Sequence, residues 1–354
     1  MNRARMLRAP ARQAGLSLVE LMVAITIGLF LLVGLVTVFS TSNQTYAELG
    51  KASQQIENGR FATQILIDDI SHAGFYGRYS GSPVLPGALP DPCVNNNMAQ
   101  LRAALALPIQ GYNAPATSPI TTCLPAANHL AGTDIIVVRR ADSTMSAGDA
   151  VSIPNAALTA NGIYIQSNAD STMQPIVAVG TGGQAADQAT FSLKNKEPTQ
   201  YAPIRRYHVH IYFIAPCSVP AGGGTVCTGG TDDNGSPIPT LKRIELAANG
   251  TMNVISLVEG IENFQVDYGI DTDKDGVPDA GYVVAPGTVA DWSNIVSLRI
   301  NVLSRQIEPS GVDYVDAKTY DMGVAGTVTP GGNFKRHVYN AVIRIVNPAS
   351  RRES

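Results

Sequence analysis

An apolar run near the N-terminus constrains this chain more than any other feature. The segment GLSLVELMVAITIGLFLLVGLVTVF covers residues 15–39, and the only charged residue between Leu16 and Phe39 is Glu20. As a helix this run would extend roughly 36 Å, at about 1.5 Å per residue, which is enough to cross a bilayer. The first fifteen residues hold four arginines and no acidic residue, which favours a cytoplasmic location for that end. The sequence therefore predicts a membrane-spanning helix over 16–39.

A cleaved secretory signal peptide is the main alternative interpretation of this run. Its small-residue cleavage site should follow the apolar region, but Gly15 precedes that region and no convincing A-x-A sequence follows Phe39. The first proline after Phe39 is Pro83. Between Phe39 and Pro83, apolar residues recur mostly at steps of three, four and seven. The recurring residues are Tyr46, Leu49, Ile56, Ile65, Leu66 and Ile70. We therefore predict one helix from Leu16 to about Ala73, with an amphipathic second half that lies on a folded domain.

Glu20 lies within the predicted membrane helix, where an isolated carboxylate raises the free energy of insertion by about 2.5–3.5 kcal/mol. A compact positive group would offset this cost. Cleavage after Gly15 would create such a group, because Leu16 would gain a free α-amino group and Glu20 would become the fifth residue. Pairing between Glu20 and the amine of a neighbouring subunit would turn the cost into a driving force for ordered assembly.

The stretch GLSLVELMVA, residues 15–24, resembles the class III signal of type IV pilins and type II secretion pseudopilins. In that family a prepilin peptidase cuts after the glycine and methylates the new amine, and the glutamate guides docking into the filament. The resemblance implies processing at Gly15 and Leu16 and assembly through Glu20. The usual first residue is Phe, and Leu16 is a tolerated departure. The alternative is a single-span anchored protein in which Glu20 is accidental.

The composition favours an extracytoplasmic, loop-rich β protein, because 45% of the residues are hydrophobic and only 15% are charged. Without the four leader arginines the balance is 21 basic against 28 acidic residues, or −7. An acidic body argues against nucleic acid as a partner.

The cysteines, Cys93, Cys123, Cys217 and Cys227, lie in loops rich in Pro, Gly, Ser and Thr, with no C-x-x-C motif. Of the three possible connectivities we predict the sequential one, Cys93–Cys123 and Cys217–Cys227, which closes two short loops. Disulfides imply an oxidising compartment. Four buried free thiols are the alternative.

The chain beyond the long helix predicts a β-rich head. Gly74 and Gly77 are expected to stop the helix, and a loop-rich stretch over 80–132 is expected to hold a short helix around Met98–Ala106. Strands are predicted at 134–140, 149–153, 162–166, 175–180, 189–193, 205–215, 240–246, 251–260, 263–271, 294–305 and 336–347.

Alternation within the strand over 294–305 predicts a half-buried antiparallel sheet. Val296, Leu298, Ile300 and Val302 would face one way, and Ser297, Arg299 and Asn301 the other. The expected fold class is α+β and pilin-like: a long N-terminal helix packed on an antiparallel β-sheet head with large loop insertions. The expected parts are a leader (1–15), a transmembrane and filament-core helix (16–39), its amphipathic continuation (40–75) and a periplasmic head (76–354).

One local motif carries chemistry. Asp271, Asp273, Asp275 and Asp279 occupy positions one, three, five and nine of a loop with Gly276 at position six. This is the EF-hand spacing for Ca²⁺, in which position seven, here Val277, offers its carbonyl. Tyr282 replaces the bidentate Glu at position twelve, which indicates weaker affinity. The sequence predicts a calcium loop, and an Asp/Gly-rich solvated turn is the alternative.

No enzyme class is supported. G-x-S-x-G, H-E-x-x-H, P-loop and G-x-G-x-x-G motifs are absent. His208 and His210 share one face of a predicted strand, but no third metal ligand is evident, and we expect a structural role for both.

The sequence IDDISHAGFYG after the long helix, the calcium-like loop and the final VYNAVIRIVN strand resemble the PilW family of minor pilins. These type IV pilus assembly proteins are related to the J-type minor pseudopilin of type II secretion. The resemblance covers both ends and 240–347, whereas 80–235 matches only in general character. It implies a non-enzymatic filament subunit of a Gram-negative bacterium, held in the inner membrane with a periplasmic head and later placed at the pilus tip.

The implied partners are other minor pilins of the FimU, PilV, PilX and PilE types, the major pilin, a PilY-type tip adhesin, the prepilin peptidase and the inner-membrane assembly platform. Together with the other minor pilins, the chain would form a small complex that primes polymerisation of the pilus and supports twitching motility and adhesion. Two alternatives stay open: a pseudopilin of type II secretion, and a calcium-dependent adhesive module that uses a pilin anchor.

Overall fold

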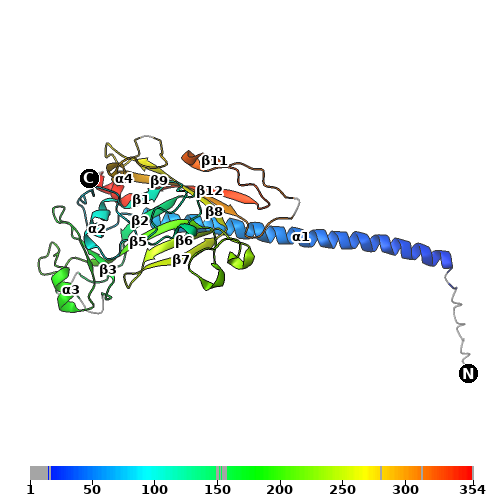
Figure 1. Cartoon of the computed structure of the whole chain (residues 1–354), viewed down its shortest axis with the longest axis horizontal. Helices are drawn as coiled ribbons and strands as arrows, with labels where there is room; N and C mark the ends of the chain where they lie inside the picture. Colours follow the sequence, from blue (N-terminus) through cyan, green and yellow to red (C-terminus); the bar gives the residue numbers. More distant parts are fainter. Residues whose placement is uncertain are drawn as a thin grey trace, which may run out of the picture. The chain divides into compact units, whose positions relative to one another are not determined.

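The structure, a computed structural model, describes residues 15, 17–148, 151, 153, 158–279, 281–311 and 314–352, with side chains as far as 349 (Figure 1). Leu16 and most of the strand predicted over 149–153 lie outside the described residues. The chain divides into two compact units, Met1–Lys51 and Ala52–Ser354. We describe each unit by itself.

A single helix, α1 (Leu18–Ser71), confirms the long helix predicted from the apolar and amphipathic patterns. In the first unit its apolar side chains are exposed, and Phe30 is 81% accessible. In the second unit α1 buries one stripe at steps of three and four: Gln55, Gly59, Ala62, Leu66, Asp69 and Ile70. Gly74 and Gly77 follow with φ of 72° and 77°, a backbone conformation that favours glycine and ends the helix.

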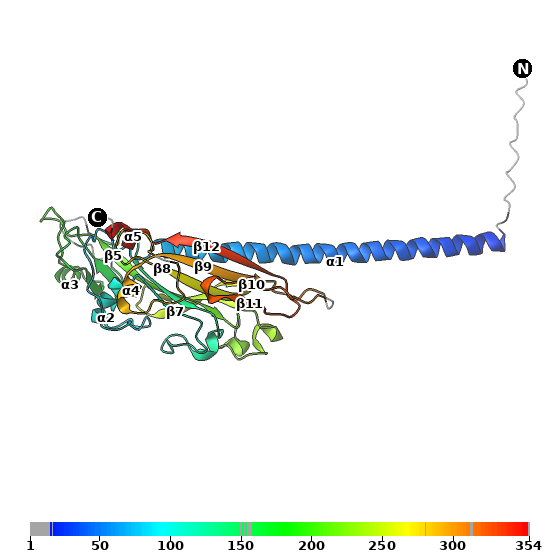
Figure 2. The same ribbon diagram turned by 90° about the horizontal axis from the view of Figure 1, so that it is seen from above.

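Two antiparallel sheets form most of the head (Figures 1 and 2). The larger has the order β1-β2-β5-β3-β4, and β6 and β7 join it through β5. Its strands are β1 (Ile109–Tyr112), β2 (Ile135–Ala141), β3 (Ile163–Gln166), β4 (Ile176–Val179), β5 (Ile204–Ala215), β6 (Thr240–Leu246) and β7 (Met252–Glu259). The smaller has the order β12-β9-β8, with β8 (Ile261–Ile270), β9 (Ile295–Arg305) and β12 (Arg336–Arg344). A short ribbon pairs β10 (Tyr320–Asp321) with β11 (Thr327–Val328).

Short helices connect the strands. They are α2 (Met98–Ala103), η1 (Ala104–Ala106), η2 (Ala126–Asn128), α3 (Gln184–Thr190), η4 (Ala221–Gly223), η5 (Asp232–Gly235), α4 (Val289–Ser293), η6 (Gly323–Ala325) and α5 (Val346–Arg352). The helix predicted around Met98–Ala106 is therefore confirmed. The last predicted strand ends earlier than expected, at Arg344, and α5 follows it.

The strand predicted over 189–193 is wrong. Its first two residues end α3, and Phe191 and Leu193 are buried from a loop. The side chain of Gln166 bonds both the N–H of Leu193, at 3.0 Å, and its carbonyl, at 3.2 Å. A side chain thus supplies the hydrogen bonds that a neighbouring strand would otherwise make.

The head has a core on each face of the larger sheet. Ile136 and Val138 of β2 point into the core that also contains Leu66 and Ile70 of α1, whereas Ile135 and Val137 point into a second core. Two-sided burial explains the nearly continuous apolar run of β2. The polar face of β9 is also covered, because Ser297 and Asn301 are buried, so this strand is not half-exposed as the alternation predicted. The observed arrangement is nevertheless the expected α+β, pilin-like fold.

Candidate functional site

The start of α1 is held by reciprocal hydrogen bonds between Ser17 and Glu20. The N–H of Ser17 donates to Glu20 Oε2 at 2.9 Å, and the N–H of Glu20 donates to Ser17 Oγ at 3.2 Å. This is a capping box, which satisfies two N–H groups that a helix leaves unpaired at its start. Among the described residues, Glu20 Oε1 accepts no hydrogen bond. Gly15 is exposed, as a peptidase would require.

The first half of α1 is long and apolar enough to cross a membrane. Its few polar side chains bond within the helix: Thr26 Oγ1 donates to the carbonyl of Met22 and Thr37 Oγ1 to that of Val33, both at 2.9 Å. Such internal pairing suits a helix in hydrocarbon, where water offers no alternative partner. Glu20 is the one ionisable side chain between Leu18 and Phe39.

The second half of α1 is bound to the larger sheet through Asp69. This buried carboxylate lies 2.7 Å from Arg140 Nε and 2.7 Å from His210 Nδ1, and it accepts a 2.8 Å hydrogen bond from the Tyr212 hydroxyl. Burial alone would raise the pKa of Asp69, but the hydrogen bond and charge of His210 and the charge of Arg140 hold it well below its usual value. Asp69 therefore joins the helix to β2 and β5.

This cluster also accounts for the two histidines of β5. His210 bonds to Asp69, and the His208 ring lies 5.4 Å from the His210 ring. Burial lowers the pKa of His208 to about 4. Neighbouring positive charges, that of His210 foremost, add to this shift, and the charge of Asp142 opposes it. Both residues have the structural role that we expected. Asp69 was not among the predicted site residues, although its place in the apolar stripe with Leu66 and Ile70 is the signal of a buried acid that needs partners.

Further contacts join α1 to the smaller sheet. Gln55 Nε2 donates to the carbonyl of Ser304 and Ser304 Oγ donates to the carbonyl of Gln55, both at 3.0 Å. At Gly59 the aromatic ring of Tyr339 packs on the helix backbone, so that a Cβ would lie 2.1 Å from Tyr339 Cε2. The helix is thus fixed to both sheets at defined points.

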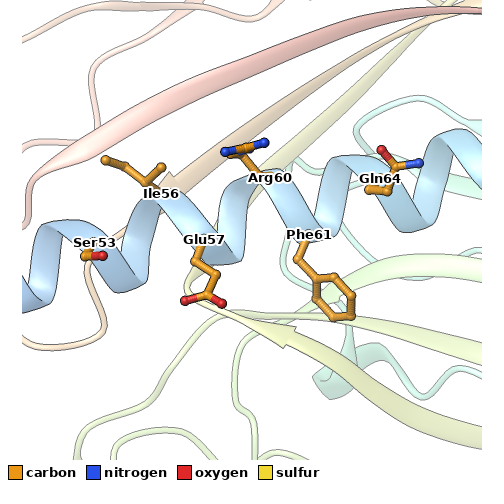
Figure 3. A pocket seen from close by; sticks show the side chains of 6 residues that line it. All are labelled: Ser53, Ile56, Glu57, Arg60, Phe61 and Gln64. Atoms are coloured by element: carbon orange, nitrogen blue, oxygen red, sulfur yellow. The ribbon is translucent and has the colours of Figure 1, made fainter.

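The opposite face of α1 in the head is open. It is lined by Ser53, Ile56, Glu57, Arg60, Phe61 and Gln64 around a hollow of about 540 Å³, and Figure 3 shows these side chains along one turn after another. Ile56 and Phe61 are 50% and 55% exposed. Figure 3 shows these two side chains pointing to different sides of the helix, so they flank the hollow and do not form one apolar patch.

The acidic loop lies between β8 and α4. Its four aspartates place one oxygen each within 4.8 Å of one another, with Asp271 buried and the other three exposed. The N–H groups of Lys274 and Gly276 donate to the two oxygens of Asp271 at 2.6 and 3.1 Å. Lys274 and Gly276 have φ of 68° and 85°, which turns the loop tightly around Asp271. A cluster of this kind can bind a cation.

The negatively charged carboxylates in this loop repel one another. The N–H of Asp275 stabilises the Asp273 carboxylate, but desolvation and the negative charges of Asp275 and Asp279 outweigh it and raise the pKa of Asp273. Hydrogen bonds from the hydroxyl and N–H of Thr272 lower the pKa of Asp279. Tyr282, at position twelve, receives a 3.2 Å hydrogen bond from Ser297 Oγ. The cluster therefore offers carboxylates from the first nine positions of the loop and none from the twelfth.

Two disulfides, Cys93–Cys123 and Cys217–Cys227, join the pairs that the sequence analysis predicts. The second closes a loop that Asp232 organises by accepting hydrogen bonds from the N–H groups of Ala221, at 2.8 Å, and Thr228, at 2.6 Å. The bonded sulfurs are not available to a metal ion, although Asp232 lies beside them. These disulfides agree with an oxidising compartment.

Two known family models match parts of the chain. The prokaryotic N-terminal methylation motif matches residues 10–36, which include Gly15, Leu16 and Glu20. The type IV pilus-assembly protein W family matches residues 228–347, from the residue after Cys227 to the start of α5. No curated protein and no solved structure matches the chain.

The methylation motif, the apolar helix and the sheets packed on its second half define a prepilin-like protein. Residues 228–347 match the PilW family of type IV pilus assembly proteins, and the N-terminal methylation motif is the one that prepilin-like proteins carry. Members of this family are structural, pilin-like proteins, and the N-terminal helix indicates anchoring in the inner membrane before incorporation into a pilus.

Proposed function

We propose that this chain is a minor pilin that enters a tip or priming complex through its N-terminal helix and initiates assembly of the type IV pilus. The observation that carries the proposal is the difference between the two halves of α1. Its first half exposes an apolar surface behind a methylation motif, and its second half is bonded into a large head.

The leader, residues 1–15, is removed between Gly15 and Leu16, and Leu16 is then methylated. Residues 16–39 hold the subunit in the membrane and later in the filament core, and 40–75 continue the helix into the periplasmic head, 76–354. Glu20 pairs with the N-terminal amine of a neighbouring subunit. Its capping box supports this role, because Ser17 occupies Oε2 and leaves Oε1 for an incoming cation.

A head of this size suits the tip better than the shaft, because a filament tip has fewer neighbours to accommodate. The expected partners are minor pilins of the FimU, PilV, PilX and PilE types, a PilY-type adhesin at the tip and the major pilin below. The prepilin peptidase and the assembly platform act on the subunit in the inner membrane. Twitching motility and adhesion then depend on this protein indirectly.

Surface piliation in a strain that lacks this chain tests the proposal. We expect few or no pili in the deletion strain, restoration by the unaltered chain and no restoration by Glu20→Ala. Normal piliation in the deletion strain would contradict the priming role. Loss of protein secretion with normal piliation would instead identify a type II secretion pseudopilin, and loss of adhesion alone would identify an adhesive module.

We further propose that the acidic loop binds Ca²⁺. Asp271, Asp273, Asp275 and Asp279 would supply carboxylate oxygens and Val277 a carbonyl, a donor set of hard oxygen ligands. The repulsion among the carboxylates and the tight turn at Gly276 support this assignment. The missing acidic ligand at position twelve predicts the weak affinity of extracellular sites, about 10⁻⁴–10⁻³ M.

Thermal unfolding with Ca²⁺ and with a chelator tests the calcium proposal. The unaltered chain should melt at a higher temperature in millimolar Ca²⁺, because a ligand that binds only the folded state stabilises it. The double variant Asp271→Ala, Asp275→Ala should lose this difference, whereas Asp232→Ala, in another acidic loop, should keep it. Equal melting of the unaltered chain with Ca²⁺ and with chelator would remove the proposal.

A further inference from the structure

Arg139 on β2 is a buried cation whose hydrogen-bond partners are all neutral. Its side chain is 1% exposed. Nη1 donates to the carbonyl of Leu107 at 2.9 Å, and Nη2 donates to Oε1 of Gln110 at 2.8 Å. In the part of the chain that the structure describes, the guanidinium has only these two partners. An arginine has five N–H donors, so three of them are left without a protein acceptor there.

Other arginines in the interior of the head have counter-charges. Arg336 is the other buried arginine among the described residues, and its guanidinium forms ion pairs with two carboxylates. Arg140, the next residue along β2, lies 2.7 Å from the carboxylate of Asp69. A buried charge without a counter-charge costs several kcal/mol. Because an arginine keeps its proton in proteins, Arg139 cannot avoid this cost by becoming neutral.

Two tyrosine hydroxyls on the same face of the larger sheet add further donors. The register of β2 and β5 places Tyr207 opposite Ala141, which is diagonal to Arg139 and within reach of long side chains. The Tyr207 hydroxyl is buried and has no hydrogen-bond partner among the described residues. On β1 the Tyr112 hydroxyl accepts a 2.8 Å hydrogen bond from Gln110 Nε2, but it donates to none of the described residues. This face therefore gathers unused donors around a positive charge.

Nearby acidic groups do not supply the missing charge. Burial lowers the pKa of Arg139, and the groups that oppose this shift are tyrosines, of which Tyr207 is the first. Asp91 acts on the neighbouring Tyr112, but its carboxylate is exposed and accepts a hydrogen bond from the N–H of Cys93 at 2.9 Å. The missing partner of Arg139 therefore comes from outside the described chain.

The surroundings of Arg139 restrict the kind of partner. A water molecule could accept hydrogen bonds from these donors, but it would leave the positive charge without compensation. The neighbours of Arg139 on this face, Val137, Ala141 and Val209, are buried and apolar. Such walls favour a small anion that has lost its water over a bulky or hydrated one.

We propose that the second core of the head binds a small monovalent inorganic anion of the chloride type, held by the guanidinium of Arg139 and the hydroxyls of Tyr207 and Tyr112. The anion accepts hydrogen bonds from groups on β1, β2 and β5, which are neighbours in the larger sheet (Figure 1). It thereby neutralises Arg139 and joins the three strands. The proposal does not depend on the priming role or on calcium, because it concerns the interior of the folded head.

Thermal unfolding of the full-length chain in detergent tests this proposal. Buffers of equal ionic strength contain a chelator and sodium chloride, sodium bromide or sodium gluconate, whose anion is too large for the site. We expect the melting temperature to be at least about 2 °C higher in chloride than in gluconate, because a ligand that binds only the folded state stabilises it. Bromide should also raise it. Equal melting in chloride and in gluconate would overturn the proposal and assign water to the unused donors.

Arg139→Met removes the charge and should abolish the rise in melting temperature with chloride. A rise that persists in this variant would be a general salt effect and would contradict the site.

Tyr207→Phe gives a second measurement, which decides the question if Arg139→Met does not fold. It removes a donor to the anion and no hydrogen bond between described residues. The chloride concentration for half of the stabilisation should increase at least about fivefold. Tyr164→Phe is the matched control, because this buried tyrosine accepts a 2.7 Å hydrogen bond from the N–H of Thr159, and it should leave that concentration within about twofold. Equal chloride concentrations for the two variants would contradict the proposed site.

Discussion

Two carboxylates on the same helix have opposite surroundings. Asp69, near the end of α1, is buried and bonds to Arg140, His210 and Tyr212. Glu20, near its start, is exposed, and among the described residues it bonds to Ser17 alone. A charge whose partners all lie in its own chain fixes the fold. For Glu20, whose second carboxylate oxygen has no partner among the described residues, we propose that the charge serves contact with another chain.

Glu20→Gln gives the sharpest test of this contrast and the largest expected effect. Glutamine keeps the capping box with Ser17 but removes the charge that would attract a neighbouring amine. If the pairing recovers the cost of about 2.5–3.5 kcal/mol for a carboxylate in the membrane, its loss should reduce surface pili about a hundredfold.

Immunogold counts of surface pili at equal membrane levels of the variant protein provide the measurement. Glu48→Gln, the same change on the same helix at the partly exposed pair with Lys51, is the control and should leave the counts within about twofold. Normal piliation with Glu20→Gln would show that capping alone explains this residue.

Asp69→Asn should destabilise the folded head by about 3–5 kcal/mol, because Arg140 would lose its charged partner in a buried site. Urea unfolding of the full-length chain in detergent, followed by tryptophan fluorescence of Trp292, measures the loss. Asp68→Asn changes the neighbouring exposed aspartate, which bonds Gln64 at 2.7 Å, and should cost less than about 0.5 kcal/mol. Equal costs for the two variants would contradict the role assigned to Asp69.

The substitution Gly59→Ala should cost about 1–3 kcal/mol, because the new methyl group overlaps the Tyr339 ring. The higher helix propensity of alanine offsets about 1 kcal/mol of this cost. Gly50→Ala provides the matched control, since nothing lies within 4 Å of its new Cβ, and it should not destabilise. The same urea titration distinguishes them, and an unchanged midpoint for Gly59→Ala would show that Tyr339 moves aside freely.

The last effect is a pH dependence from His208, which is absent at neutral pH and grows only as the solution is acidified. Its pKa is about 4 in the folded chain against about 6.5 unfolded, so the unfolded state binds the proton first as pH falls. Stability should be complete above about pH 6.5 and should decline towards pH 4, by no more than about 1.4 kcal/mol per pH unit. His208→Gln should flatten this decline, and the exposed control His337→Gln should keep it. Parallel declines in all three proteins would assign the pH dependence elsewhere.

Local patterns were sufficient to predict much of the fold. The 3.6-residue period defined α1 to within two residues, and the alternation over 240–246 predicted β6 with its observed ends. Such elements are predictable because the signal lies within the segment itself. Cysteine spacing likewise indicated the two disulfides.

The remaining features depend on contacts between distant residues. Nothing near Phe191 reveals that Gln166 would replace a strand partner. The covered polar face of β9 depends on a turn at Gly323, where a Cβ would lie 2.3 Å from Asp267 Oδ2. The cluster around Asp69 required β2, β5 and α1 to meet, and only the fold shows that they do.

Mass spectrometry of the N-terminus tests the central claim most directly. The full-length gene is expressed in cells that contain an active prepilin peptidase, and the chain is extracted from their membranes. The account predicts that residues 1–15 are absent and that the first residue is Leu16 with a methylated amine. A chain that retains residues 1–15 under these conditions would contradict it.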